Sequence, residues 1–266
     1  MNIKLGFMLS FAICFSVQSN AQSFQRSNTG INAVVDSLNV EIQFYSPDIV
    51  RVIKYPVGHR FVKHSLSVIK TPEQTAFNVK QKGDFLNLQS HDVRITLNLK
   101  SGTLSFYSNK GVSLLNEKAN GVSFTPFNDA GNKTFNVLQS FILDKDEPIY
   151  GLGQQQGGKM EQRNVRLHMV QGNTDDYIPI FQSVKGYGVF WDNYSPTVFI
   201  NNDDSTSFKS DVGEGVDYYF MYGGNADGVI ARMRDLTGQV PMFPLWTYGY
   251  WQSKERYKTQ AELVDV

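Results

Sequence analysis

The sequence predicts a mainly β protein, an antiparallel β-sandwich that is followed by the opening of a parallel β/α unit. Two observations predict the sandwich: apolar and polar residues alternate in short runs from about Val34 onward, and turn-forming residues separate these runs. A third observation, a change of pattern in residues 245–266, predicts the β/α unit. The chain has 266 residues, of which 41% are hydrophobic and 19% charged, so it can bury a substantial core.

Alternation defines the individual strands. Residues 38–44 and 93–99 carry an apolar side chain at every second position. Residues 103–107 lie between Ser-Gly and Asn-Lys-Gly turns, which predicts consecutive hairpins. Further strands are predicted at residues 133–141, 187–191, 197–200 and 217–222. Many short strands with little helix between them are typical of an antiparallel sandwich.

One internal helix is predicted after the last of these strands. Asn225 can cap its start, and Gly238 with Pro241 can end it. Its apolar side chains recur at helical spacing and form one face, made of Val229, Ile230, Met233 and Leu236.

The end of the chain predicts a different architecture. Residues 245–251 follow two prolines and lack alternation, as does a strand covered on both faces. Thr259 and Glu262 have the spacing of a capping box, in which each side chain accepts from the backbone amide of the other residue. A buried strand followed by a helix opens a parallel β/α unit. Few residues remain after Glu262 to complete that helix, so we expect the chain to be a fragment.

The N-terminus has the features of an export signal. Lys4 precedes an apolar run at residues 5–17, and small residues up to Ala21 supply a cleavage site. The alternative is a membrane anchor, but the run is shorter than the roughly 20 residues of a span, and no later segment is apolar enough to cross a membrane. Because the single cysteine, Cys14, leaves with residues 1–21, the mature chain has no disulfide. We therefore expect a secreted protein of the periplasm or cell surface of a Gram-negative bacterium.

Charge and motif content exclude several functions. The chain carries 25 basic and 25 acidic residues, so it has no net field to hold nucleic acid. Four scattered histidines lack the spacing of metal ligands. The glycines at residues 151–157 have the wrong spacing for a nucleotide-binding fingerprint. No cofactor and no metal are expected.

Two carboxylates suggest sugar recognition. Asp175 and Asp176 lie in a polar turn that ends in aromatic residues. Carboxylates accept hydrogen bonds from sugar hydroxyls, while aromatic rings cover the C–H faces of a sugar. The alternative is a solvated loop with an Asx turn. The residues alone leave both interpretations open.

A series of motifs between residues 150 and 257 closely resembles glycoside hydrolase family 31. The order and the spacing of the motifs agree along this whole section, whereas residues 22–148 match only in strand pattern. The motifs are YGLG at 150–153, NTD at 173–175 with PIF at 179–181, YGVFWDN at 187–193, DYYF at 217–220, LTG at 236–238, PLW at 244–246 and GYWQSKERY at 249–257.

The resemblance implies an N-terminal galactose-mutarotase-like β-sandwich followed by a (β/α)8 barrel. It thus divides the chain into a signal peptide (1–21), a sandwich (22–244) and the first β/α unit of a truncated barrel (245–266). Members of the family are retaining α-glycosidases whose two catalytic aspartates lie on later barrel strands. The resemblance therefore implies that this chain contains no catalytic residue, and that the remaining barrel of the same polypeptide is its partner.

The resemblance also assigns candidate binding residues. Asp175 matches a family aspartate that binds sugar hydroxyls, whereas Asp176 has no matched role. Tyr250, Trp251 and Gln252 follow the first barrel strand, near the expected pocket. Trp251 could equally belong to the barrel core.

Residues 251–257 differ from the Cys-Arg pair expected in α-glucosidases, a departure that looks more like the bacterial α-xylosidase-type members. The sequence thus indicates the N-terminal part of an exported O-glycosyl hydrolase that acts on oligosaccharides with α-linked xylose or glucose. One alternative is a stand-alone carbohydrate-binding sandwich without hydrolase activity. Another, resting on the fold alone, is mutarotase-like epimerisation, which needs a His/Glu pair that the sequence does not reveal.

Overall fold

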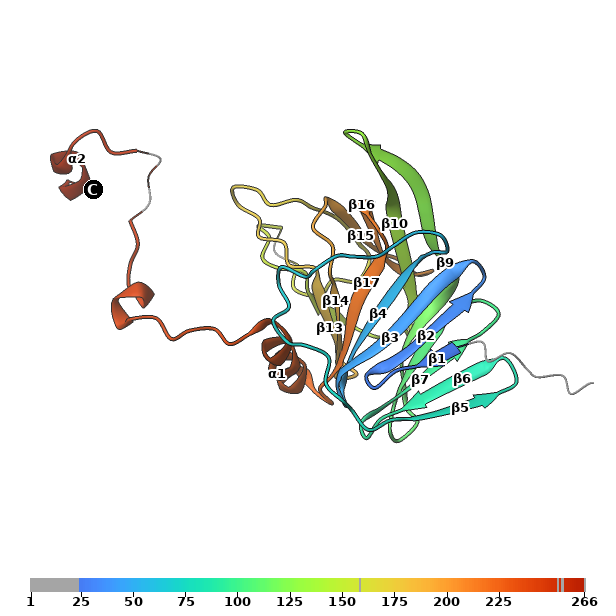
Figure 1. Ribbon diagram of the computed structural model, residues 1–266. Helices are drawn as coiled ribbons and strands as arrows, with labels where there is room; N and C mark the ends of the chain where they lie inside the picture. The colour runs from blue at the N-terminus through green and yellow to red at the C-terminus, as the bar shows by residue number, and fades with distance from the viewer. Residues whose placement is uncertain (1–23, 158, 253, 255, 266) are drawn as a thin grey trace, which may run out of the picture.

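Two antiparallel β-sheets pack face to face in the structure, a computed structural model that describes residues 24–157, 159–252, 254 and 256–265 (Figure 1). The proposed signal peptide, residues 1–21, lies outside the described residues. The predicted antiparallel β-sandwich is confirmed.

The first sheet has eight strands, ordered β1-β2-β3-β4-β17-β14-β13-β11. Four of its strands come from the start of the described sandwich sequence and four from its later half, so distant segments become neighbours; β4, for example, pairs with β17. The strands are β1 (Phe24–Arg26), β2 (Gly30–Val35), β3 (Leu38–Ser46), β4 (Ile49–Pro56), β11 (Ile149–Gly151), β13 (Ile180–Ser183), β14 (Tyr187–Trp191) and β17 (Val216–Tyr222).

The second sheet has nine strands, ordered β12-β15-β16-β10-β9-β8-β7-β6-β5. Its long hairpin β9–β10 extends beyond the neighbouring strands and projects from the sandwich in Figure 1. The strands are β5 (Asn78–Lys82), β6 (Phe85–Gln89), β7 (Val93–Asn98), β8 (Leu104–Ser108), β9 (Ser113–Asp129), β10 (Asn132–Ile142), β12 (Val165–Met169), β15 (Thr197–Asn201) and β16 (Thr206–Gly213).

The main core lies between the two sheets and is rich in aromatic rings. The Trp191 ring of β14 stacks on Phe208 of β16, with ring centroids 5.4 Å apart and planes inclined by 4°. The indole N–H of Trp191 donates to the Ser210 hydroxyl at 2.9 Å, which satisfies its one polar group inside the core. Alternation therefore worked as a predictor because each alternating strand turns one face toward this core.

A fully buried ion pair also joins the two sheets. The ammonium of Lys54 in β4 contacts the carboxylate of Glu117 in β9, and both side chains are at most 1% exposed. The Lys54 ammonium also donates to the Gly102 carbonyl at 2.9 Å. Glu117 accepts from the Tyr218 hydroxyl at 2.8 Å and from the Leu104 amide at 2.7 Å. Burial, followed by the charge of Glu117, raises the pKa of Tyr218, so this phenol remains a donor.

The predicted helix is present as α1 (Ala226–Thr237) on the outer face of the eight-stranded sheet. The Asn225 side chain accepts from the Gly228 amide at 2.8 Å, and Gly238 ends the helix at a φ of 100°. Leu236 packs on the sheet, whereas Ile230 of the predicted apolar face is 45% exposed. Within the described residues, α1 is the longest helix, and no helix is long and apolar enough to cross a membrane.

The predicted strand at residues 245–251 is wrong for this structure. Leu245–Tyr248 forms a one-turn 3₁₀ helix, η1, and Leu245 is 88% exposed. A buried strand needs hydrogen-bonded neighbours on both sides, and the described part of the chain places none beside this segment. The structure therefore does not contain the expected first barrel strand.

The second half of the predicted β/α unit is present in part, as the short helix α2 (Gln260–Val264). The Thr259 hydroxyl accepts from the Glu262 amide at 3.1 Å, which confirms one half of the capping box. The other half is wrong, because the Glu262 carboxylate accepts from the Lys258 amide at 2.9 Å rather than from that of Thr259.

The buried pair gives a stability prediction. Replacement Lys54→Met leaves the Glu117 carboxylate unpaired inside the core, so we expect the free energy of unfolding in urea to fall by about 3–5 kcal/mol. The matched control is Lys100→Met, because Lys100 pairs with Asp84 at 2.7 Å while both side chains are more than half exposed. The control should change stability by less than about 1 kcal/mol. Equal effects of both substitutions would contradict the prediction.

Candidate sugar-binding site

The loop that carries Asp175 connects the two sheets. It consists of residues 170–179 and runs from β12, the edge strand of the nine-stranded sheet, to β13 of the eight-stranded sheet. We call it the Asp175 loop. It lies on the side of the sandwich from which the C-terminal extension leaves (Figure 1). Its position therefore depends on how the two sheets are held together.

One end of the loop is fixed by the chain after β11. The Gln154 amide donates to the Asp176 carbonyl at 2.7 Å, and the Asp176 amide donates back to the Gln154 carbonyl at 2.8 Å. Gly153 permits this close approach, because a Cβ there would lie 1.9 Å from the Asp176 carbonyl oxygen. Its φ of +89° also favours glycine. The glycines that failed to fit a nucleotide fingerprint thus have a structural role beside the loop.

The Asp175 carboxylate is partly buried and keeps accepting capacity. It accepts one hydrogen bond from the Gln156 amide at 3.2 Å. A carboxylate can accept about four hydrogen bonds, and among the described residues this is the one donor it contacts. Asp175 can therefore bind hydroxyl groups of a ligand without losing its own support.

Tyr177 places an aromatic ring beside this carboxylate. Partial burial, followed by the negative charge of Asp175, raises the pKa of the Tyr177 phenol. The hydroxyl therefore remains protonated at neutral pH and can donate a hydrogen bond. The ring borders a groove of about 340 Å³ that also includes Gln171, Pro179 and Tyr194. A carboxylate next to a phenol whose ring borders a largely apolar groove is a combination that sugar recognition uses.

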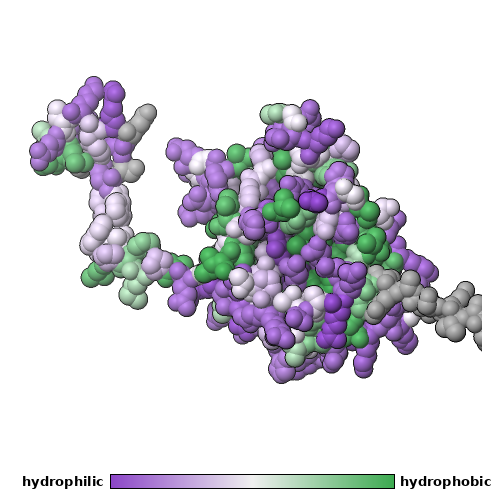
Figure 2. Space-filling model, in the orientation of Figure 1, coloured by the Kyte–Doolittle hydropathy of each residue, from purple (hydrophilic) through white to green (hydrophobic). Residues whose placement is uncertain are grey.

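Asp176 faces a different hollow from that groove. Its side chain is exposed, and the hollow of about 360 Å³ lies against α1, with Ile178 and Ile230 on its walls. Both isoleucines are close to half exposed. Figure 2 shows apolar residues on this side of the molecule, where the C-terminal extension begins. The two adjacent aspartates thus have different surroundings.

The three other candidate residues gather elsewhere. Trp251 donates from its indole to the Thr247 carbonyl at 2.9 Å, and Gln252 donates to the Tyr257 hydroxyl at 2.7 Å and accepts from Tyr250. All three lie in the C-terminal extension, which runs away from the sandwich in Figure 1. The structure therefore brings Tyr250, Trp251 and Gln252 together, but it does not bring them to Asp175. Trp251 is 64% exposed here rather than part of a core.

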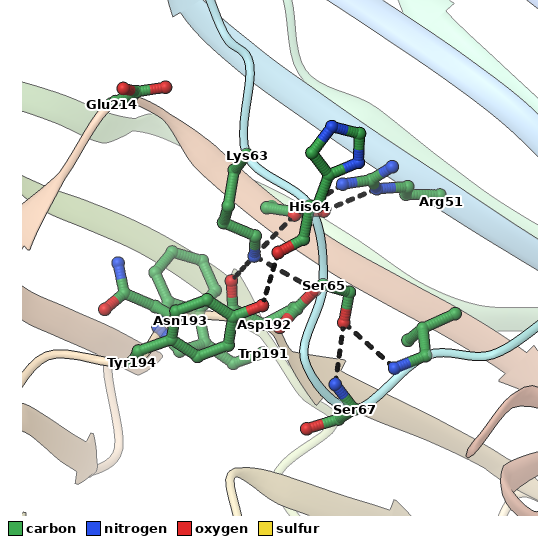
Figure 3. A network of polar contacts seen from close by, with 12 residues as sticks. Arg51, Lys63, His64, Ser65, Ser67, Trp191, Asp192, Asn193, Tyr194 and Glu214 are labelled. Atoms are coloured by element: carbon green, nitrogen blue, oxygen red, sulfur yellow. Dashed lines mark hydrogen bonds and ion pairs between the residues drawn. The ribbon is translucent and has the colours of Figure 1, made fainter. Parts of the chain in front are cut away.

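A buried charge cluster supports the far wall of the groove (Figure 3). The Lys63 ammonium lies 3.0 Å from the Asp192 carboxylate and 2.7 Å from that of Asp217. Arg51 makes two hydrogen bonds of 2.8 Å to Asp217. Burial, followed by the neighbouring Asp217, raises the pKa of Asp192. Two cations balance two carboxylates, so the cluster is structural.

This cluster orients Tyr194. Lys63 lies 4.9 Å from the centre of the Tyr194 ring, and the Tyr194 hydroxyl donates to the His64 carbonyl at 2.9 Å. The sequence analysis missed this wall. A usable signal was present, because Asp192 directly follows the apolar run of β14 and Asp217 lies within the apolar β17, where a buried charge needs a partner.

Comparisons with known proteins identify the family. Residues 39–199 match the model of the glycosyl hydrolase 31 N-terminal galactose mutarotase-like domain. The chain therefore belongs to glycoside hydrolase family 31, and it contains the N-terminal domain of that family.

The most similar curated relatives include an α-xylosidase of Saccharolobus solfataricus, 36% identical over 87% of this chain and 33% of the relative. Another is an α-glucosidase of Bacillus thermoamyloliquefaciens, 28% identical over 93% of this chain and 32% of the relative. The chain thus spans about a third of the length of these relatives.

Solved structures support the fold. A family 31 α-xylosidase from Xanthomonas citri superposes with a TM-score of 0.84 at 22% identity, over 91% of this chain and 43% of the other. An α-xylosidase from a soil metagenome, solved with xylose, gives 0.82 at 23% identity, over 92% and 39%. At these identities the similarity supports the fold alone.

The contact at Gly153 can be tested directly. Replacement Gly153→Ala puts a Cβ into the Asp176 carbonyl and strains a positive φ, so we expect a loss of at least about 1 kcal/mol of stability. Amide hydrogen exchange at Asp176 should also accelerate. Gly157→Ala is the matched control, because a Cβ there meets nothing within 4 Å and its φ is not positive. An unchanged exchange rate at Asp176 in the Gly153 variant would contradict the described contact.

Proposed function

We propose that this chain is the N-terminal part of an exported, retaining α-glycosidase that hydrolyses oligosaccharides with α-linked xylose or glucose. Its sandwich would supply Asp175 to the rim of the substrate site. The observation that carries this proposal is a partly buried carboxylate with spare accepting capacity, held beside an aromatic ring. Membership of family 31 and the similarity to an α-xylosidase support the reaction class.

Hydrolysis with retention needs two carboxyl groups about 5–5.5 Å apart, one as nucleophile and one as acid and base. We infer that both belong to a barrel that follows this domain in the longer protein. The buried carboxylates of the sandwich are poorly suited to that chemistry. Glu117 is paired with Lys54, and Asp217 with Arg51 and Lys63.

In this proposal Asp175 binds substrate but does not react with it. Its free lone pairs would accept hydrogen bonds from sugar hydroxyls, and the Tyr177 hydroxyl could donate one. Tyr250, Trp251 and Gln252 remain candidate contacts, which would need the barrel to bring them to the same pocket. Export rests on residues 1–21 alone.

The proposed placement of the reacting carboxyl pair in a following barrel makes a prediction about activity. The 266-residue chain alone should not hydrolyse α-xylosides or α-glucosides, because it lacks the reacting pair. The longer protein should hydrolyse at least one of them, and NMR of the first-formed sugar should show retention of the anomeric configuration. Turnover by the purified 266-residue chain would contradict the proposal.

The role of Asp175 makes a second prediction. In the longer protein, Asp175→Ala should lower kcat/KM by roughly tenfold to a hundredfold, the effect of losing a hydrogen bond of about 1.5–3 kcal/mol to a charged acceptor. Asp176→Ala is the matched control, since its side chain faces away from the groove. If the Asp175 variant keeps the kcat/KM of the unmodified enzyme, the loop is a solvated turn without a binding role.

A further inference from the structure

We propose that Gln171 is a positioning residue that fixes the Asp175 loop in its binding geometry. The inference rests on the proposed function of Asp175 and deepens it. No motif of the sequence analysis includes Gln171, which follows β12 by two residues.

The Gln171 side chain makes two hydrogen bonds to one residue. Its Nε2 donates to the Tyr177 carbonyl at 2.8 Å, and its Oε1 accepts from the Tyr177 amide at 2.7 Å. This pattern is that of two strands in a narrow antiparallel pair, with a side-chain amide in place of the second peptide. These two hydrogen bonds close residues 172–176 into a loop, and Asp175 is the fourth of its five residues.

Only a side-chain amide can make this closure. Asparagine and glutamine carry a neutral donor and a neutral acceptor side by side on one planar group, whereas the two ring nitrogens of a neutral histidine point in different directions. A carboxylate would repel the Tyr177 carbonyl oxygen, and an ammonium would leave the Tyr177 amide without an acceptor. The chemistry of the clamp therefore explains the residue type at position 171.

The clamp acts on both functional groups of the candidate site. Asp175 lies inside the segment that the clamp closes, directly before the backbone bridge of Asp176 with Gln154 and two residues before the clamped Tyr177. Tyr177, whose ring borders the groove, is the residue that the clamp holds. Among the anchors in the described residues, Gln171 is the side chain that can be replaced without altering the backbone.

Its surroundings indicate a role in positioning rather than in folding. Gln171 is exposed, as are residues 172–174, and its side-chain amide bonds to the backbone of Tyr177. A loop of exposed polar residues would otherwise sample several conformations, and ordering it on ligand binding would weaken affinity. The clamp removes this ordering cost before the ligand arrives.

The experiment compares Gln171→Met with Gln81→Met in the longer enzyme. Methionine keeps the length of the side chain but removes both donor and acceptor. Gln81 is a matched control, because its side chain is exposed and its amide donates to the Gly83 carbonyl at 3.2 Å. It lies on β5, the edge strand of the nine-stranded sheet opposite β12. Asp175→Ala and the double variant Asp175→Ala with Gln171→Met complete the set.

Two readouts are expected to change together. Hydrogen exchange at the Tyr177 amide should accelerate at least tenfold in Gln171→Met and not in Gln81→Met. For the substrate that the enzyme hydrolyses best, kcat/KM should fall about tenfold, mainly through KM. The double variant should be no worse than Asp175→Ala alone, because Gln171 acts through Asp175.

The outcomes separate this inference from the proposed function. If Asp175→Ala lowers kcat/KM but Gln171→Met does not, or if Tyr177 exchange stays unchanged, the positioning role of Gln171 is overturned. The proposed role of Asp175 then still stands. Losses that add fully in the double variant would also overturn it, since Gln171 would then act independently of Asp175. If Asp175→Ala itself leaves kcat/KM unchanged, the proposed role of Asp175 fails, and this inference fails with it.

Discussion

The contact between Lys54 and Glu117 constrains how the two sheets can pack. A charge with 1% or less of its side chain exposed must be paired, so β4 and β9 cannot slide past one another without separating it. Tyr218, Leu104 and Gly102 satisfy the remaining polar atoms, which extends the constraint to β17 and to the turn before β8. The Asp175 loop starts on one sheet and ends on the other. Its position is thus set by a core contact that has no part in binding.

The same requirement for pairing distinguishes structural from functional carboxylates. Glu147 accepts from the Ser183 and Tyr187 hydroxyls and pairs with Lys185 at 2.9 Å, so it is fully engaged. Asp175, by contrast, has one weak backbone donor and partial exposure. Epimerisation inside the sandwich would need an acid–base pair that a sugar can reach. The glutamates in the described core are enclosed and paired instead, which favours binding at the rim over chemistry in the core.

Alternation and capping residues predicted the strands that face the core and the main helix. They failed where a neighbouring strand or a contact with a distant segment determines the structure. The run at residues 187–191 is β14 to the residue, and the helix capped by Asn225 is α1. The polar edge strand β5 has no alternation to detect. Residues 245–251 have the composition of a buried strand, but a strand exists only beside neighbours, and composition does not report them. Asp175 could be selected by its chemistry and by family resemblance. Gln171 and Gly153 could not, because their roles depend on contacts between separate segments.

In the proposed function, the β-sandwich contributes to sugar recognition by holding one loop in a fixed geometry. Strands β12 and β13 lie at the two ends of the Asp175 loop, the Gln154 bridge fixes its second half at Asp176, and the Gln171 amide closes it. These contacts use backbone groups and the Gln171 amide, so the Asp175 carboxylate and the Tyr177 ring stay available to a ligand. Affinity for a flexible oligosaccharide is limited by the freedom lost on binding. A loop that is already ordered reduces the protein's share of that loss, and this is the contribution that the proposed function assigns to the sandwich.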